Sequence, residues 1–451
     1  MKIMSSYGVK IKDCNHNMFR DFVTIYRDAV SFFIDVCSRE WDSFLGLSSL
    51  KRIPFMESLT HATKKNPNPK YDFGKADKRF YKMPSGYRRA VMQAAIGSYS
   101  SYFSNLQNWK ENPVGKEPTL QFDRNLSPVF YYSERKGDVY SGTLELKLYY
   151  KHDWVWVPIR LNRQDVKYLN SHCKDRKICS PSLQKKGKCW YLVYPFEEHQ
   201  DLCDTDIEDQ LVCAVDLGIN KHAVCSILRS DGTVVGRKFI DFPMEKDHLY
   251  KAVNRVKKAQ QHGATRCPNK WKHVRDINTD ISRKVANAII AFAVLYSVDV
   301  IVFEHLDTKG KKKGSKKQRL VLWRHGEIQT LVEHKAHRLG MRIRRVCAKN
   351  TSKFAFDGSG EVSRGTYLQN GEEKYNYSIC IFPSGKQYHC DLNASYNIGA
   401  RYFVRELLKS DKILCRLPGQ TNVSDYGTGT TRTLSTLIRL HADTHGLPCA
   451  I

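Results

Sequence analysis

The chain has 451 residues, with 73 Lys and Arg against 46 Asp and Glu, so its formal net charge at pH 7 is +27. That excess is greater than solubility requires and indicates a polyanionic partner. A hydrophobic fraction of 41% and an aromatic fraction of 11% are enough for true cores, which excludes a disordered basic tail. The length allows two to four domains.

Sequence signals for secretion and membrane insertion are weak. The first residues, MKIMSSYGVKIKDC, contain no apolar run typical of a signal peptide. The most apolar window, 288–298, is shorter than the roughly 20 residues that span a bilayer. We therefore expect a soluble, cytoplasmic protein with no membrane partner, whose 14 scattered cysteines stay reduced.

The first part of the chain changes from a helical to a strand pattern. Apolar residues at helical spacing predict an amphipathic helix over 17–40, and a second helix begins after Pro84 and carries Arg88 and Arg89 near its start. A shift in composition near 118 introduces runs with a period of two residues, which predict antiparallel hairpins in a small β-barrel or meander. The acidic linker EEHQDLCDTDIEDQ, ending near 210, closes this region.

After the linker, the order of the predicted elements indicates a fold. LVCAVDLGIN, KHAVCSIL and TVVGRKFI predict three antiparallel strands. They are followed by an amphipathic helix around 281–292, a strand at 299–303, the helix EIQTLVEHKAHRLG with Gly340 as its C-cap, and the strand MRIRRVC. This succession is typical of an RNase H-like α/β fold.

Two of these strands end in a carboxylate. Glu304 follows the apolar run VIVF, and Asp216 closes LVCAVD in the same way. A lone strand-end acid is usually exposed, because burying a carboxylate is costly without a partner. In an RNase H-like fold, however, the first and fourth strands are parallel neighbours, so both acids should emerge at one edge.

A third acid, Asp391, begins the predicted helix DLNASYNIGARYFVRELL. The macrodipole favours an acid there, and by itself such a residue is more often a helix cap. Beside two strand-end acids, a cation site is the better interpretation, because adjacent carboxylates raise one another's pKa and a divalent cation relieves the repulsion. Oxygen ligands favour Mg²⁺ or Mn²⁺ over zinc. Two such ions about 4 Å apart can hydrolyse a phosphodiester.

Several segments resemble a known family. AVDLGINKHAV, VIVFEHL and DLNASYNIGARY are similar to the three RuvC motifs of the transposon-encoded TnpB nucleases and of the type V CRISPR effectors derived from them. PSGYRRAVMQAAIGSYSSYFSNLQNW, Trp323 and EHKAHRLGMRIRRV also resemble this family, so the similarity extends over most of the chain.

The resemblance implies an RNA-guided DNA endonuclease with a single RuvC site, in which Asp216, Glu304 and Asp391 are the catalytic ligands of two Mg²⁺ (or Mn²⁺) ions. The implied partners are a guide RNA and a target double-stranded DNA, with sequence read by base pairing and a short flanking motif read by the protein. It also implies one chain per guide RNA and a nucleoid-associated, prokaryotic location.

The implied architecture is multidomain and combines all-β, all-α and α/β parts. The expected domains are a wedge β-barrel (1–12 and 118–209), a helical recognition lobe (13–117), an RNase H-like RuvC domain (210–346 and 390–412), a ribbon-like insertion that binds target nucleic acid (347–389), and a Gly/Thr-rich C-terminal tail without an assigned role (413–451).

The insertion departs from the family pattern, which has a zinc ribbon of two CxxC pairs. The chain contains no CxxC pair, and Pro383 stands where a partner of Cys380 would fall. We therefore expect a zinc-free insertion. It should be held by five apolar side chains: Phe354, Phe356, Ile379, Ile381 and Phe382. The alternative is a zinc site at unusual spacing, formed by Cys347, Cys380, His389 and Cys390. His389 and Cys390 also stand where the family commonly has an acid and an Arg.

Two groups of cations are candidate nucleic-acid contacts. They are Arg88 and Arg89 in the second helix and, in KGKKKGSKK, Lys311, Lys312, Lys313, Lys316 and Lys317. A solvated basic loop explains the lysine run equally well. Two other functions stay open. One is an RNA-guided DNA-binding repressor without cleavage, although all three acids are present here; the other is a guide-free RNase H-like nuclease or transposase.

Overall fold

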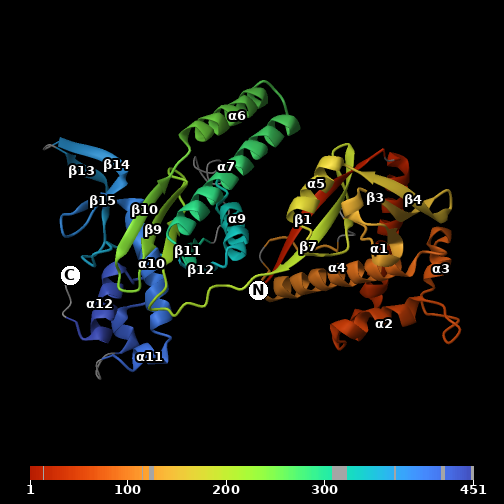
Figure 1. The fold of residues 1–451 in the computed structure, drawn as a ribbon, viewed down its shortest axis with the longest axis horizontal. Helices are drawn as coiled ribbons and strands as arrows, with labels where there is room; N and C mark the ends of the chain where they lie inside the picture. The colour runs from red at the N-terminus through yellow and green to blue at the C-terminus, as the bar shows by residue number, and fades with distance from the viewer. Residues whose placement is uncertain are drawn as a thin grey trace. The chain divides into compact units, whose positions relative to one another are not determined.

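The computed structural model describes residues 1–13, 15–113, 115–120, 126–306, 322–369, 372–417 and 422–447, without the side chains of 366–369 and 372–374. Its contacts divide the chain into two compact units, Lys2–His199 and Gln200–Ile451, the second of which includes Met1. Figure 1 shows the elements of each unit. No helix among the described residues is both long and apolar enough to cross a bilayer.

The unit Lys2–His199 contains a seven-stranded sheet in the order β2-β3-β4-β1-β7-β5, with β6 also paired to β7. Its strands are β1 (Lys2–Lys12), β2 (Arg135–Lys136), β3 (Thr143–Tyr150), β4 (Asp153–Leu161), β5 (Lys177–Ile178), β6 (Ser182–Lys186) and β7 (Cys189–His199). The N-terminal strand β1 is central, because it pairs antiparallel with both β7 and β4. The strand path of the described residues has two ends, so a barrel stays a prediction.

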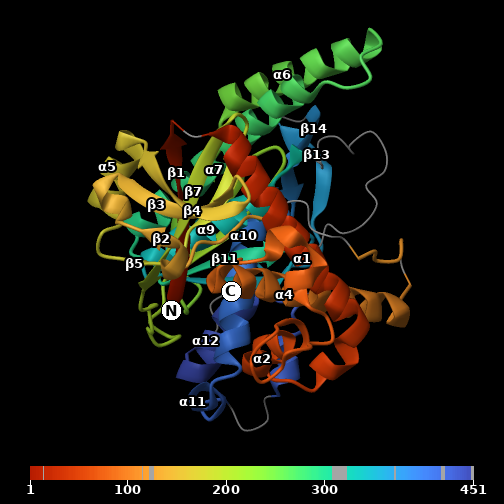
Figure 2. The same cartoon turned by 90° about the vertical axis from the view of Figure 1, so that its right-hand side faces the viewer.

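Helices complete this unit. They are α1 (His16–Leu45), α2 (Ser49–Thr60), α3 (Phe73–Ala76), α4 (Ser85–Glu111) and α5 (Arg163–His172). The helix predicted over 17–40 is confirmed and continues to Leu45, and α1 packs beside α4 (Figure 2). The contact is aromatic, since the Phe22 and Tyr87 ring centroids lie 5.2 Å apart and those of Trp41 and Tyr99 lie 4.8 Å apart.

The unit Gln200–Ile451 is built on a five-stranded sheet in the order β10-β9-β8-β11-β12. Its strands are β8 (Val212–Asp216), β9 (Ala223–Leu228), β10 (Val234–Ile240), β11 (Val300–His305) and β12 (Arg342–Cys347). β8 pairs antiparallel with β9 and parallel with β11, which in turn is parallel to β12. The prediction that the first and fourth strands are parallel neighbours is therefore confirmed.

Helices cover both faces of this sheet. They are α6 (Pro243–Gln261), α7 (Pro268–Leu295), α9 (His325–Arg338), α10 (Cys390–Leu407), α11 (Asp411–Leu414) and α12 (Leu434–His445). One core joins the sheet to α7 and α9, and a second joins the opposite face to α10 and α12. The C-cap of α9 is Leu339, one residue before the predicted Gly340. Gly340 follows with a φ of 79°, which allows the Met341 N–H to bond back to the Ala336 carbonyl at 3.0 Å.

Between β12 and α10 the chain forms a three-stranded sheet of β13 (Ser363–Gln369), β14 (Glu372–Ile381) and β15 (Gln387–His389). Its small core contains Ala355, Cys380, Phe382 and Cys390, with Phe356 packed against them. Of the five apolar residues predicted to hold this insertion, Phe356 and Phe382 therefore belong to the core.

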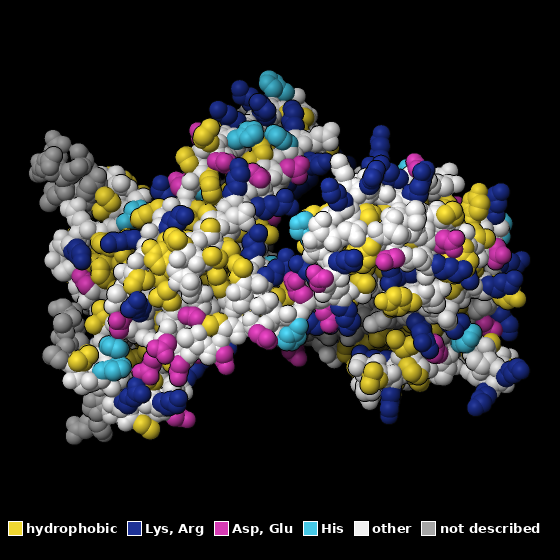
Figure 3. Space-filling view, in the orientation of Figure 1, with side chains coloured by type: hydrophobic (Ala, Val, Ile, Leu, Met, Phe, Trp, Pro, Cys, Tyr) yellow, Lys and Arg dark blue, Asp and Glu magenta, His cyan; other side chains and the backbone are white. Residues whose placement is uncertain are grey.

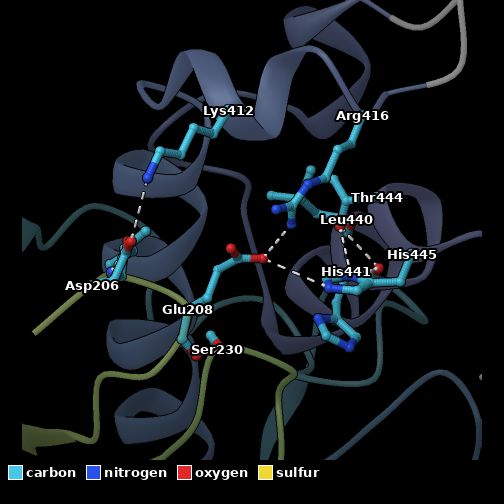
Figure 4. Close-up of polar contacts among 10 residues, drawn as sticks. Asp206, Glu208, Ser230, Lys412, Arg416, Leu440, His441, Thr444 and His445 are labelled. Carbon is cyan, nitrogen blue, oxygen red and sulfur yellow. Dashed lines mark hydrogen bonds and ion pairs between the residues drawn. The ribbon is translucent and has the colours of Figure 1, made fainter.

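The C-terminal segment, which we define as residues 422–447, differs from the Gly/Thr-rich tail predicted over 413–451, because it packs into the core of the unit. Leu434, Leu437 and Leu440 of α12 are buried in the core under α10. Polar contacts also tie the chain on both sides of residues 418–421 to the residues before β8 (Figure 4): Glu208 accepts from Arg416 at 2.7 Å, and His445 lies 3.6 Å from it. The segment is part of the folded unit.

Candidate active site

Asp216 and Glu304 end adjacent parallel strands. β8 and β11 pair in register as far as Val215 opposite Phe303, so the two acids are the next residues of their strands. Glu304 is 8% exposed and Asp216 is partly buried. The predicted meeting of these acids at one sheet edge agrees with this register.

The strand geometry also indicates which way both acids point. Alternate residues of a strand face opposite sides of the sheet. Ala214 and Val302, two positions before Asp216 and Glu304, belong to the core under α10. Both acids therefore lie on the α10 side of the sheet, where Asp391 occupies the first turn of that helix.

Close packing brings α10 against this face. A Cβ atom on Gly399 would lie 2.8 Å from the Leu228 side chain and 3.2 Å from the Ala214 Cβ, so a glycine is needed for this approach. At the start of the helix, the Asp391 backbone N–H donates to His389 Nδ1 at 3.3 Å. His389 is therefore the N-cap of α10, and Asp391 is not.

The other two acids act electrostatically on Asp216. Burial raises the pKa of Asp216 well above its usual value, and the charges of Glu304 and Asp391 raise it further. The Arg364 guanidinium on β13 opposes this increase. Burial likewise raises the pKa of Glu304, while a hydrogen bond from the Thr351 hydroxyl and the charge of Arg401 lower it.

The described residues contain no group of three or more His, Cys, Asp and Glu side chains that could by itself hold a metal ion. Glu304 and Asp391 both lie within electrostatic range of Asp216, but the described acids do not form a closed ligand shell. Their chemistry fits a hard divalent cation, because all the donors are carboxylate oxygens and their repulsion would be relieved by positive charge.

The four residues of the alternative zinc site lie in different environments. Cys380 and Cys390 are buried, and their thiols donate to the backbone carbonyls of Tyr388 and Tyr377, each at 3.4 Å. Cys347 is exposed at the end of β12. His389 is half-buried and packs edge-to-face on Phe239, with ring centroids 4.8 Å apart.

The predicted nucleic-acid contacts have different outcomes. Arg89 is exposed on α4 and pairs with Glu57 at 3.4 Å, whereas Arg88 is partly buried. Lys311, Lys312, Lys313, Lys316 and Lys317 lie outside the described residues.

Sequence reasoning missed a dense basic surface on the hairpin of α6 and α7. Its exposed cations are Lys251, Arg255, Lys257, Lys258, Arg266, Lys270, Lys272 and Arg275. Figure 3 shows Lys and Arg side chains along this hairpin. The available sequence signal is the density of cations, since eight Lys and Arg lie between residues 251 and 275.

An exposed aromatic pair was also missed. Tyr375 and Tyr377 of β14 are each 65% exposed, with ring centroids 4.8 Å apart. The Tyr375 ring lies over Gly365, where a Cβ atom would be 2.8 Å from it. The Tyr377 carbonyl accepts from the Cys390 thiol, next to Asp391. Two tyrosines spaced by two residues in a strand are the available sequence signal.

Comparisons with known proteins relate the chain to two groups. The model of the Aq_aa04 family matches residues 5–150. The uncharacterized protein aq_aa04 of Aquifex aeolicus (strain VF5) is 28% identical over 126 residues, which cover 24% of this chain and 68% of that protein. The residues matched by the family model lie in the first unit and do not include the acids.

Similar solved structures are type V CRISPR effectors. A Cas12f1–sgRNA–target DNA complex has a TM-score of 0.33 at 17% identity, covering 88% of this chain and 98% of that one. The mini-RNA-guided endonuclease CRISPR-Cas_phi3 has a TM-score of 0.46 at 11% identity, with coverages of 88% and 92%. The Alicyclobacillus acidoterrestris C2c1 structure with single-guide RNA has a TM-score of 0.39 at 10% identity, with coverages of 85% and 70%. These superpositions are loose, so the description of the site rests on the strand register of this chain.

Proposed function

We propose that this protein is an RNA-guided DNA endonuclease with one RNase H-like, RuvC-type site. The observation that carries the proposal is the pair of acids at the ends of adjacent parallel strands, both facing the helix that begins with Asp391. The strand order and directions agree with those expected for this fold, and the three motifs resemble those of TnpB and type V effectors.

The proposed cofactor is a pair of Mg²⁺ or Mn²⁺ ions held by Asp216, Glu304 and Asp391. Such ions supply an activated water and stabilise the leaving oxygen of a phosphodiester. The chain itself fixes the positions of Asp216 and Glu304, since the strand residues that precede both acids are buried. Arg364, whose charge acts on Asp216, is placed to offset negative charge brought in by a phosphate.

The proposed partners are one guide RNA per chain and a target double-stranded DNA with a short flanking motif. The net charge of +27 and the exposed cations of α6 and α7 support a phosphate backbone as the ligand. In this scheme, the strands of the first unit form the wedge and its helices the recognition lobe.

The decisive experiment is to purify the protein with its co-expressed locus, sequence the bound RNA, and challenge the complex with a plasmid complementary to that RNA. We expect one discrete RNA and cleavage that EDTA abolishes. A discrete RNA with binding but no cleavage would favour the repressor. Random RNA fragments would contradict guided recognition and favour the guide-free nuclease.

A further inference from the structure

The helix that begins with Asp391 carries a buried polar stripe whose role goes beyond the three acids. Asn393, Asn397 and Arg401 follow one another at intervals of four residues, so they lie on one face of α10. Their exposed fractions are 0%, 0% and 2%. Burial of amide and guanidinium groups is costly unless each is hydrogen-bonded.

Each member of the stripe binds the backbone of residues 347–356, the segment between β12 and the insertion. Asn393 Nδ2 donates to the Phe354 carbonyl at 2.9 Å, and Asn397 Nδ2 donates to the Thr351 carbonyl at 2.9 Å. Arg401 Nη1 donates to the carbonyls of Cys347 and Lys349, both at 2.8 Å.

The C-terminal segment closes the other side of the stripe. Arg401 Nε and Nη2 donate to the carbonyls of Arg432 and Thr430, at 3.2 and 2.9 Å. Asn397 Oδ1 accepts from the Leu434 N–H at 3.2 Å. Arg401 therefore joins α10, residues 347–349 and the C-terminal segment through four backbone carbonyls.

The segment held in this way carries Thr351, which is 3% exposed. The Thr351 hydroxyl donates to Glu304 Oε1, and the charge of Arg401 also acts on the Glu304 carboxylate. Residues that hydrogen-bond a metal ligand fix its orientation and its ionised form.

We propose that Thr351 and Arg401 are positioning residues that set the Glu304 carboxylate for a divalent cation, with the C-terminal segment as part of this support. This inference rests on the proposed function, because it assumes that Glu304 is a metal ligand. It assigns a structural role to residues 430–434, which the sequence left without one.

The test is Mn²⁺ binding to the full-length protein without nucleic acid, measured by calorimetry. Thr351→Val removes the hydroxyl and keeps the shape, and should weaken Mn²⁺ binding about 10–100-fold. Thr351→Ser, which keeps the hydroxyl, should restore binding to within about threefold of the parent. The matched control is Thr60→Val, since the buried Thr60 hydroxyl donates to the Met56 carbonyl of its own helix at 2.7 Å, and it should leave Mn²⁺ binding unchanged.

Arg401→Lys keeps the charge but cannot reach four carbonyls with three donors, so Mn²⁺ binding should fall about tenfold. Arg405→Lys, one turn further along α10, loses a bond to the Arg345 carbonyl and should bind Mn²⁺ as the parent does. Thermal unfolding identifies variants that fail to fold. If Arg401→Lys is one of them, Mn²⁺ binding by Thr351→Val alone tests the positioning role.

The outcomes separate the two claims. If Asp216→Ala abolishes Mn²⁺ binding but Thr351→Val and Arg401→Lys do not weaken it, the positioning roles are wrong and the metal site stands. If the parent protein binds no Mn²⁺, or Asp216→Ala binds it equally well, both the metal site and the positioning roles are overturned.

Discussion

The two units fill their interiors with different side chains. In Lys2–His199 the described core is aromatic and aliphatic, and Thr60 and Glu134 are its buried polar residues. In Gln200–Ile451, buried polar side chains cluster near the strand ends that carry Asp216 and Glu304. Those nearest to these ends are Glu304, Gln329, Thr351, Asn393, Asn397 and Arg401.

The two interiors differ in what their buried side chains require. Apolar burial stabilises at roughly 25 cal/mol per Å² and needs only complementary shape. Each buried polar group instead requires a partner, and losing that partner costs about 1–3 kcal/mol. We therefore expect the buried polar groups near Asp216, whose pKa Glu304 and Asp391 raise, to serve the proposed site at some cost in stability.

The largest expected effect tests that statement directly. Asp216→Asn replaces the ionisable carboxyl group with a neutral amide of nearly the same shape, so it should abolish DNA cleavage. Because it also removes repulsion with Glu304 and Asp391, the free protein should unfold at the same or a higher temperature. Guide RNA binding should stay within about twofold, because the RNA contacts that we propose lie on other residues. Plasmid cleavage, thermal unfolding and RNA binding measure the three properties.

Two results would contradict these expectations for Asp216. Persistent cleavage by Asp216→Asn would mean that the catalytic acids were wrongly assigned. A clear fall in unfolding temperature would mean that Asp216 stabilises the fold. The buried polar residues would then not lower the stability of this unit for the sake of the site. Asp391→Ala provides a second removal and should also lose cleavage.

Most of the second unit's sheet could be predicted from sequence because its strands are covered on both faces. β8, β9 and β11 are therefore continuous apolar runs, which are easy to recognise. α6 was missed because its buried face consists of Ala252, Val253 and Val256 among many cations. The leucines of α12 were missed because the Gly/Thr-rich residues before them indicate a loop.

The acids of the site could be predicted because each lies at the end of a regular sequence pattern. Asp216 and Glu304 follow apolar strand runs, and Asp391 begins a helical pattern. Their supporting residues could not be predicted. Thr351 contacts Glu304 across 47 positions of sequence, and Arg401 reaches the Cys347 carbonyl across 54. Such contacts depend on how distant segments pack, and one sequence contains no local pattern that reports them.

The second prediction concerns aromatic residues, which the first unit buries and the insertion exposes. We expect Tyr375 and Tyr377 to stack on bases of single-stranded DNA, a contact worth about 1–3 kcal/mol per base. Replacing both with Ala should weaken binding of a fluorescent single-stranded oligonucleotide by about 10–100-fold, whereas replacing both with Phe should not.

A matched control sharpens this prediction. Tyr250 on α6 is also 65% exposed, but no ring contact places it in a pair among the described residues. Tyr250→Ala should therefore change oligonucleotide binding much less than the double variant. Equal losses would indicate that any exposed tyrosine contributes, and the pair would have no special role.

The smallest expected effect concerns the buried acid of the first unit. Glu134 is 1% exposed and accepts from the Ser133 hydroxyl at 2.7 Å. Its carboxylate lies against Gly86, in the first turn of α4, where the helix macrodipole favours negative charge. A Cβ atom on Gly86 would collide with both carboxylate oxygens. The first unit therefore makes room for its buried acid with a glycine, whereas the second unit surrounds its acids with polar side chains.

Gly86→Ala should therefore lower the free energy of unfolding of this unit by about 1–3 kcal/mol, the usual cost of overpacking. Gly97→Ala, in the same helix, meets no atom within 4 Å and should be neutral or stabilising by up to about 1 kcal/mol. Denaturant unfolding of the three proteins measures the difference. If Gly86→Ala behaves like Gly97→Ala, Glu134 is not held against the helix, and the first unit would then need another partner for its buried charge.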